Sequence, residues 1–150
     1  MATKAIQEEI LSTRLIRRWE QVGQKLASLA EEIPENKFNY RPVDSVRTLA
    51  DVLRHIAFWN QYVADLAHGR KADDKANELP RSEFPTKARI LDALKRSAAD
   101  ASDALRKHKA ALSPDMAETV VTFVEHNCEH YGQLVVYARL NGIIPPASRG

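Results

Sequence analysis

The stretch TLADVLRHIAFWNQYVADLAHG, residues 48–69, has the apolar spacing of an amphipathic helix. The helix is predicted to begin at Thr48, a residue type common at the N-cap, with Asp51 three positions later as a capping partner. Gly69 predicts the end of the helix, since glycine readily adopts the left-handed conformation found there. The apolar side chains at spacings of three and four are Leu49, Val52, Leu53, Ile56, Trp59, Val63 and Leu66.

The segment after this helix decides how the chain is connected. Between Gly69 and Pro85 the residues are polar and charged, include Pro80 and show no periodicity. This length is unusual for a turn between antiparallel helices. We therefore predict a crossover that lets the helices on either side of it run parallel.

Helical periodicity also predicts a helix before this stretch and another after the crossover. The earlier helix ends at Pro34, because proline does not continue a helix. Its apolar stripe is Leu15, Trp19, Val22, Leu26, Leu29 and Ile33. The later helix follows Pro85-Thr86. Its stripe is Leu91, Leu94, Ala98, Ala101, Leu105 and Leu112.

A last helix is predicted between two clear end signals. Ser113-Pro114 combines an N-cap residue with a first-turn proline, and Asn141-Gly142 is a typical C-terminus. Four long helices with one long connection predict an all-α protein, a four-helix bundle. At 150 residues the chain is most simply one domain, residues 1–150.

Composition and charge argue against several functional classes. The net charge is only +2, and no dense Lys/Arg cluster interleaved with aromatic residues supports nucleic-acid binding. No uncharged apolar run is long enough to span a membrane. The single Cys128 excludes an intramolecular disulfide, and the first residues lack the apolar core of a secretory signal. These features lead us to expect a cytoplasmic protein.

Polar side chains form a line along the last predicted helix. His126, His130, Gln133 and Tyr137 fall within about 40° of one another around the helix axis. Two histidines four positions apart can bind one metal ion. Apolar residues flank the line, so we expect it to face inward, where each unpaired polar group costs about 1–3 kcal/mol.

His55 is the best candidate for a third ligand, because it lies at the edge of the apolar face of the helix at residues 48–69. Three neutral imidazoles would bind zinc or a similar divalent ion and leave coordination positions open, as catalytic sites do. The alternative is a structural bundle in which the histidines satisfy one another or buried carbonyl groups. His68 and His108 are weaker candidates. Cys128 is expected to be a small core residue that points away from the site.

Four segments of the chain resemble the DinB-like superfamily. They are HNCEHYGQL at residues 126–134, YARLNGIIPP at 137–146, RTLADVLRHIA at 47–57 and FNYRP at 38–42. The resemblance spans nearly the whole chain. It implies a bundle of up-down-down-up connectivity, which agrees with the long crossover between the second and third helices.

The resemblance also implies a metal site and a class of chemistry. Family members typically bind zinc or nickel through three histidines that correspond to His55, His126 and His130. Characterised relatives include transferases and isomerases that use low-molecular-weight thiols, and homodimers are common. The resemblance thus implies a metal-dependent thiol S-transferase acting on a small molecule, with the thiol as co-substrate.

Two other functions stay open from the sequence. One is a non-catalytic metal-binding stress protein or dimerisation module, and the other is a metal-dependent hydrolase. Asp51, Gln133 and Tyr137 are candidates for orienting a ligand histidine or contacting a substrate. No residue is assigned a catalytic role from the sequence.

Overall fold

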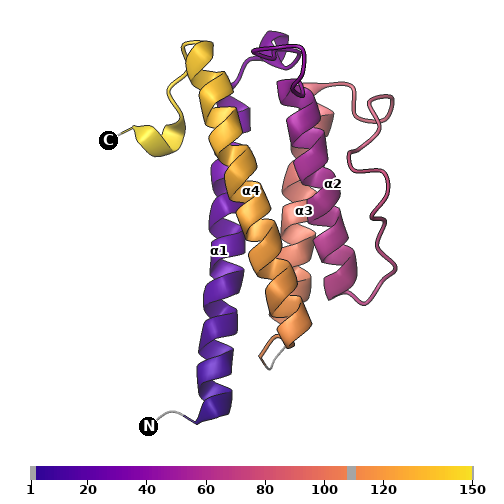
Figure 1. The fold of residues 1–150 in the computed structure, drawn as a ribbon, viewed down its shortest axis with the longest axis vertical. Coiled ribbons are helices and arrows are strands. Elements are labelled where there is room, and N and C mark those ends of the chain that lie inside the picture. Colours follow the sequence, from indigo (N-terminus) through magenta and orange to yellow (C-terminus); the bar gives the residue numbers. More distant parts are fainter. Residues whose placement is uncertain (1–2, 108–110, 150) are drawn as a thin grey trace.

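Four helices form the structure, a computed structural model that describes residues 3–107 and 111–149 (Figure 1). They are α1 (Lys4–Glu32), α2 (Leu49–Ala67), α3 (Lys87–Lys107) and α4 (Pro114–Leu140). Two short 3₁₀ helices, η1 (Glu35–Lys37) and η2 (Pro146–Ser148), follow α1 and α4. The described residues contain no strand. The predicted all-α four-helix bundle is confirmed.

The connectivity is up-down-down-up (Figure 1). The first residue of α3, Lys87, donates from its side chain to the carbonyl of Ile33 near the end of α1. His68, which ends α2, contacts Asp100 in the later half of α3. Because the end of α2 lies beside the later half of α3, these two helices run parallel. The predicted crossover is therefore confirmed, and residues 68–86 carry the chain back along the bundle.

The helix ends follow the local signals in the sequence. Thr48 accepts a hydrogen bond from the backbone N–H of Asp51, and Ser113 accepts one from Met116. Gly142 has a φ of +74°, which glycine adopts without steric cost. α1 begins well before the predicted stripe, at Lys4. Its early turns project past the other helices and leave apolar side chains exposed (Figure 1). Because no face of these turns is buried, the apolar stripe that predicts the buried face of α1 does not extend over them.

The core fills the space between the four helices along most of their length. Its largest fully buried side chains include Trp19, Leu29, Leu53 and Leu134. The stripe predicted for α3 is slightly misplaced, because Ile90 is buried and Leu91 only half-buried. Leu112 is buried but lies after the end of α3.

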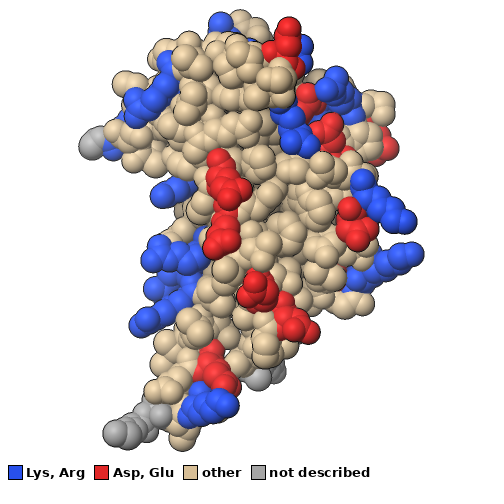
Figure 2. Space-filling model, in the orientation of Figure 1, with Lys and Arg blue, Asp and Glu red and all other residues tan. Residues whose placement is uncertain are grey.

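Charged side chains are distributed over the surface without one dominant sign. On the face in Figure 2, acidic side chains follow α4 and basic ones follow the adjacent edge of α1. No helix among the described residues has the length and hydropathy needed to cross a membrane.

Candidate metal centre

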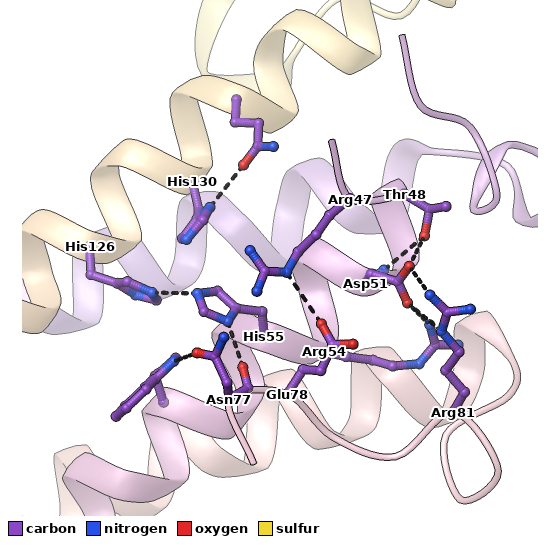
Figure 3. Close-up of polar contacts among 12 residues, drawn as sticks. Arg47, Thr48, Asp51, Arg54, His55, Asn77, Glu78, Arg81, His126 and His130 are labelled. Carbon is purple, nitrogen blue, oxygen red and sulfur yellow. Dashed lines mark hydrogen bonds and ion pairs between the residues drawn. The ribbon is translucent and has the colours of Figure 1, made fainter. Parts of the chain in front are cut away.

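Three histidines from two helices meet in the structure (Figure 3). His55 comes from the second turn of α2, and His126 and His130 lie one turn apart on α4. One potential ligand atom from each lies within 4.8 Å of the others. The ring centroids are 4.9 Å apart for His55 and His126, and 4.6 Å apart for His126 and His130.

The Nδ1 atom of each histidine contacts an oxygen that can only accept a hydrogen bond. His55 Nδ1 lies 2.6 Å from the backbone carbonyl oxygen of Asn77. His126 Nδ1 lies 3.2 Å from Oδ1 of Asn127, and His130 Nδ1 lies 2.9 Å from Oε1 of Gln133. Each Nδ1 is thus assigned as the protonated donor. The unprotonated Nε2 of each ring is then free to bind a metal ion.

The orientation of the Gln133 amide follows from a chain of hydrogen bonds. The Tyr137 hydroxyl donates to the backbone carbonyl of Arg47 over 3.0 Å. Because its only hydrogen is used in that bond, the hydroxyl can act only as an acceptor towards Gln133, and it accepts from Nε2 of Gln133, also over 3.0 Å. The amide oxygen of Gln133 is therefore the atom that faces His130. Tyr137, Gln133 and His130 thus form one chain of hydrogen bonds, here called the relay, which begins at the backbone carbonyl of Arg47 just before α2.

Burial keeps two of the rings neutral. Loss of solvent lowers the pKa of His55 to about 4, against a smaller opposing effect of its contact with Asn77. The pKa of His126 also falls to about 4, chiefly through burial and secondly through the proximity of His130. Both imidazoles are therefore uncharged at neutral pH, the form in which histidine binds metals.

These donors fit a divalent metal ion better than a metal-free structural cluster. Nε2 atoms of His55 and His126 are 2.9 Å apart, and two lone pairs at that distance repel unless a cation or proton lies between them. A shared proton would satisfy that pair alone. His130 would still direct its Nε2 at the cluster without a donor among the described residues. One ion bonded to imidazole nitrogens at about 2.0–2.1 Å would draw the more widely separated nitrogens closer together than in this structure and would satisfy all three.

Two predictions about side chains differ from the structure. Asp51 does not orient His55: its described hydrogen bonds go to Thr48, Arg54 and Arg81, and the Asn77 carbonyl contacts His55 instead. A substrate contact of Asp51 stays a prediction. Cys128 does point away from the histidines, but it is exposed and is not a core residue. It lies beside the groove between α1 and α4. Val22 and Val124 line the same groove, but no other helix among the described residues covers the thiol, so it stays exposed.

His68 lies outside the cluster. His68 contacts Asp100 on α3, with 2.8 Å between Nε2 and the carboxylate oxygen. His68 thus forms a contact between α2 and α3 and is not part of the candidate metal site. His108 lies outside the described residues.

Three residues near the site were not identified from the sequence. Asn77 in the crossover supplies the carbonyl that orients His55, and its side chain accepts from Nε1 of Trp59. Trp59 stacks on Phe123 with centroids 5.4 Å apart and meets the ring of His126 edge-on. Arg47 lies next to the histidines (Figure 3). Of these three residues, only Asn77 carries a local sequence signal for its backbone conformation, because asparagine tolerates the positive φ of 64° found here.

Family comparison agrees with this architecture. A family model described as the DinB superfamily matches residues 18–134, which include all three histidines. No curated protein matches the chain at a significant level. Because the family match covers most of the chain, and the structure has four bundled helices with three clustered histidines, this protein belongs to the DinB superfamily.

Proposed function

We propose that this protein is a divalent-metal-dependent thiol S-transferase whose ion, zinc or nickel, is bound by His55, His126 and His130. The observation that carries the proposal is the convergence of three Nε2 atoms while every Nδ1 is held by an oxygen acceptor. A cluster with three protein ligands leaves coordination positions for another molecule, as catalytic zinc sites do.

A bound divalent ion supplies Lewis acidity, which lowers the pKa of a thiol or water molecule in its coordination sphere. The chain's own residues hold the ligand rings in place. Asn77 and Gln133 orient His55 and His130, and Tyr137 orients Gln133. In the proposed transfer, the thiol sulfur bonds to an electrophilic carbon. The leaving group departs with its bonding electron pair, and the thiol proton passes to solvent.

The first experiment measures metal content in protein purified without an affinity tag. We expect about one equivalent of divalent metal in the unmodified chain and a large loss in His126→Ala. His68→Ala is the matched control, because His68 lies at the end of α2 and bonds to Asp100. A His126→Ala variant that folds and keeps its full metal content would refute the site.

The second experiment separates transfer from the alternatives. The metal-loaded protein is incubated with a small thiol and a chromogenic aromatic halide, and both substrates and the thioether product are measured. Transfer consumes thiol and halide in equal amounts and stops after chelation of the metal. Turnover of an ester without thiol would favour the hydrolase, which the same Lewis acidity supports. Metal binding without turnover of either substrate would favour a non-catalytic binding protein.

A further inference from the structure

Arg47 places a positive charge beside the three histidines. It directly precedes Thr48, the N-cap of α2, and its Nε donates to Oε2 of Glu78 over 3.2 Å. Both side chains are partly exposed, at 37% for Arg47 and 34% for Glu78. Figure 3 shows the guanidinium with its two terminal nitrogens on the side of His55 and His130.

Those terminal nitrogens have no hydrogen-bond acceptor among the described residues. The two other arginines near this end of α2 differ in this respect. Arg54 uses its terminal nitrogens for Asp51 and the carbonyl of Phe84, and Arg81 uses one of them for Asp51. Arg47 therefore keeps the four N–H groups of its two terminal nitrogens available on the side of the histidines, while its Nε is paired with Glu78.

The position of Arg47 is coupled to the same contacts that orient the metal ligands. Its carbonyl accepts from Tyr137, the start of the relay to His130. Glu78, which holds the guanidinium, directly follows Asn77, which holds His55. The guanidinium and the histidines are thus positioned by one set of contacts.

The positive charge of Arg47 beside a binding site for a metal ion is electrostatically unfavourable unless a negative group lies between the two positive charges. A divalent ion at the histidines would be repelled by the guanidinium of Arg47, and the ion pair with Glu78 offsets only part of that repulsion (Figure 3). A ligand with a negative group between the ion and the guanidinium would relieve it. A guanidinium binds a carboxylate through two parallel hydrogen bonds.

There is space for such a group next to Arg47. A cleft of about 460 Å³ includes Arg47, Asn77 and Glu78 in its walls; it adjoins the guanidinium, and none of the three histidines lines it. Arg41 and Arg81 also contribute to its lining. Each is paired with an acidic residue, Arg41 with Asp44 and Arg81 with Asp51, as Arg47 is with Glu78. Arg47 differs from them because both of its terminal nitrogens lie on the side of the histidines (Figure 3).

We propose that Arg47 binds a carboxylate of the small-molecule thiol, so that the ligand of this site is an anionic thiol with its carboxylate a few bonds from the sulfur. This inference rests on the proposed function, because it assumes that the sulfur faces an ion held by the histidines. It adds the substrate class and a specificity-determining residue.

The test compares two thiols of equal length on Co²⁺-loaded protein. The probes are 3-mercaptopropionate and 3-mercapto-1-propanol, and binding is followed by the absorbance band that reports sulfur coordination to cobalt. We expect the carboxylate thiol to bind about tenfold more tightly or better, since a hydrogen bond to a charged group contributes about 1.5–3 kcal/mol. Arg47→Gln should abolish this preference, and Arg47→Lys should keep part of it.

Arg41→Gln is the matched control, because it removes a charge from the same cleft without altering the donors beside the histidines. It should keep the full preference. A second readout needs no thiol: Arg47→Gln should bind Co²⁺ several-fold more tightly than the unmodified chain, because a repulsive charge is gone.

The outcomes distinguish this inference from the proposed function. Equal binding of the two thiols to the unmodified chain, or a preference that survives in Arg47→Gln, overturns the anionic-thiol inference and leaves the transferase standing. Absence of the sulfur band, with butyrate still perturbing the cobalt spectrum only when Arg47 is present, refutes the thiol function and supports the carboxylate site. Protein that takes up no cobalt overturns both.

Discussion

At the residue scale, the amide of Gln133 shows how one side chain selects the metal-binding nitrogen of another. Its orientation is set by Tyr137, and it places an acceptor against Nδ1 of His130. The proton of His130 is therefore held on the side away from the cluster. His55 reaches the same state through the backbone carbonyl of Asn77.

Replacing Gln133 with leucine should weaken metal binding by about 10- to 100-fold, the usual effect of losing a partner that orients a ligand histidine. Tyr137→Phe should have a smaller effect, because Gln133 would keep its contact with His130. Dissociation constants from chelator competition measure both effects. Metal affinity unchanged in Gln133→Leu would show that the amide does not orient the ring.

Stability of the metal-free protein should depend on pH through His55. In the unfolded chain a histidine has a pKa of about 6.5, whereas burial lowers the pKa of His55 in the folded chain to about 4. Between these values the unfolded chain binds the extra proton. Stability is therefore complete above pH 6.5 and declines as the pH falls towards 4.

The expected loss is on the order of 2 kcal/mol for this one residue. Urea unfolding of chelator-treated protein from pH 7 to pH 4.5 measures it. His55→Gln should have a shallower pH dependence, since glutamine does not titrate. The same slope in both proteins would show that His55 is not the group responsible.

At the scale of elements, the crossover between α2 and α3 is part of the site. Asn77 has a φ of 64° and contacts both His55 and Trp59 of α2. Arg54 also binds the crossover: its guanidinium donates to the carbonyl oxygen of Phe84, and its own carbonyl oxygen accepts from the backbone N–H of Leu79. Residues 68–86 thus do more than connect two parallel helices.

Asn77→Val should destabilise the protein by about 1–3 kcal/mol, because a β-branched residue is strained at positive φ. It should also weaken metal binding, since the carbonyl would move away from His55. Asn77→Gly is the matched variant: glycine accepts this φ, and only the contact with Trp59 is lost. Equal metal affinity and stability in the two variants would contradict a conformational role for Asn77.

At the scale of the whole molecule, a buried ionic network connects the start of α2 to the crossover. Burial by itself would raise the pKa of the Asp51 carboxyl, but hydrogen bonds from Thr48 and Arg81 and the charge of Arg54 together lower it below its usual value. The side chains of Asp51 and Arg54 are only 5% and 7% exposed. The buried Asp51–Arg54 pair therefore depends on both partners being present, whereas Arg81 is 71% exposed.

Asp51→Asn should reduce the free energy of unfolding by about 3–5 kcal/mol, because Arg54 would be left buried without its counter-charge. Asp44→Asn is the control: its side chain is 99% exposed in a pair with Arg41, and such pairs contribute about 0–1 kcal/mol. Denaturant unfolding of both variants gives the comparison. Similar losses of unfolding free energy in the two variants would show that burial does not determine how much the network contributes to stability.

Much of the architecture can be predicted from the sequence because it depends on neighbours along the chain. Caps such as Thr48 and Ser113 act within one turn, and apolar spacing shows which face of a helix is buried. The line from His126 to Tyr137 follows from helix geometry alone. The length of the crossover likewise predicted parallel helices.

The way in which distant segments surround that line depends on the tertiary structure. The Asn77 carbonyl and the Arg47 guanidinium reach the histidines because the crossover and the start of α2 lie against them, and no local rule encodes that path. Cys128 was misjudged for the same reason, since its exposure depends on what α1 and η2 leave uncovered. Helical periodicity acts over a few residues, whereas a site of this kind is assembled by contacts across the whole chain.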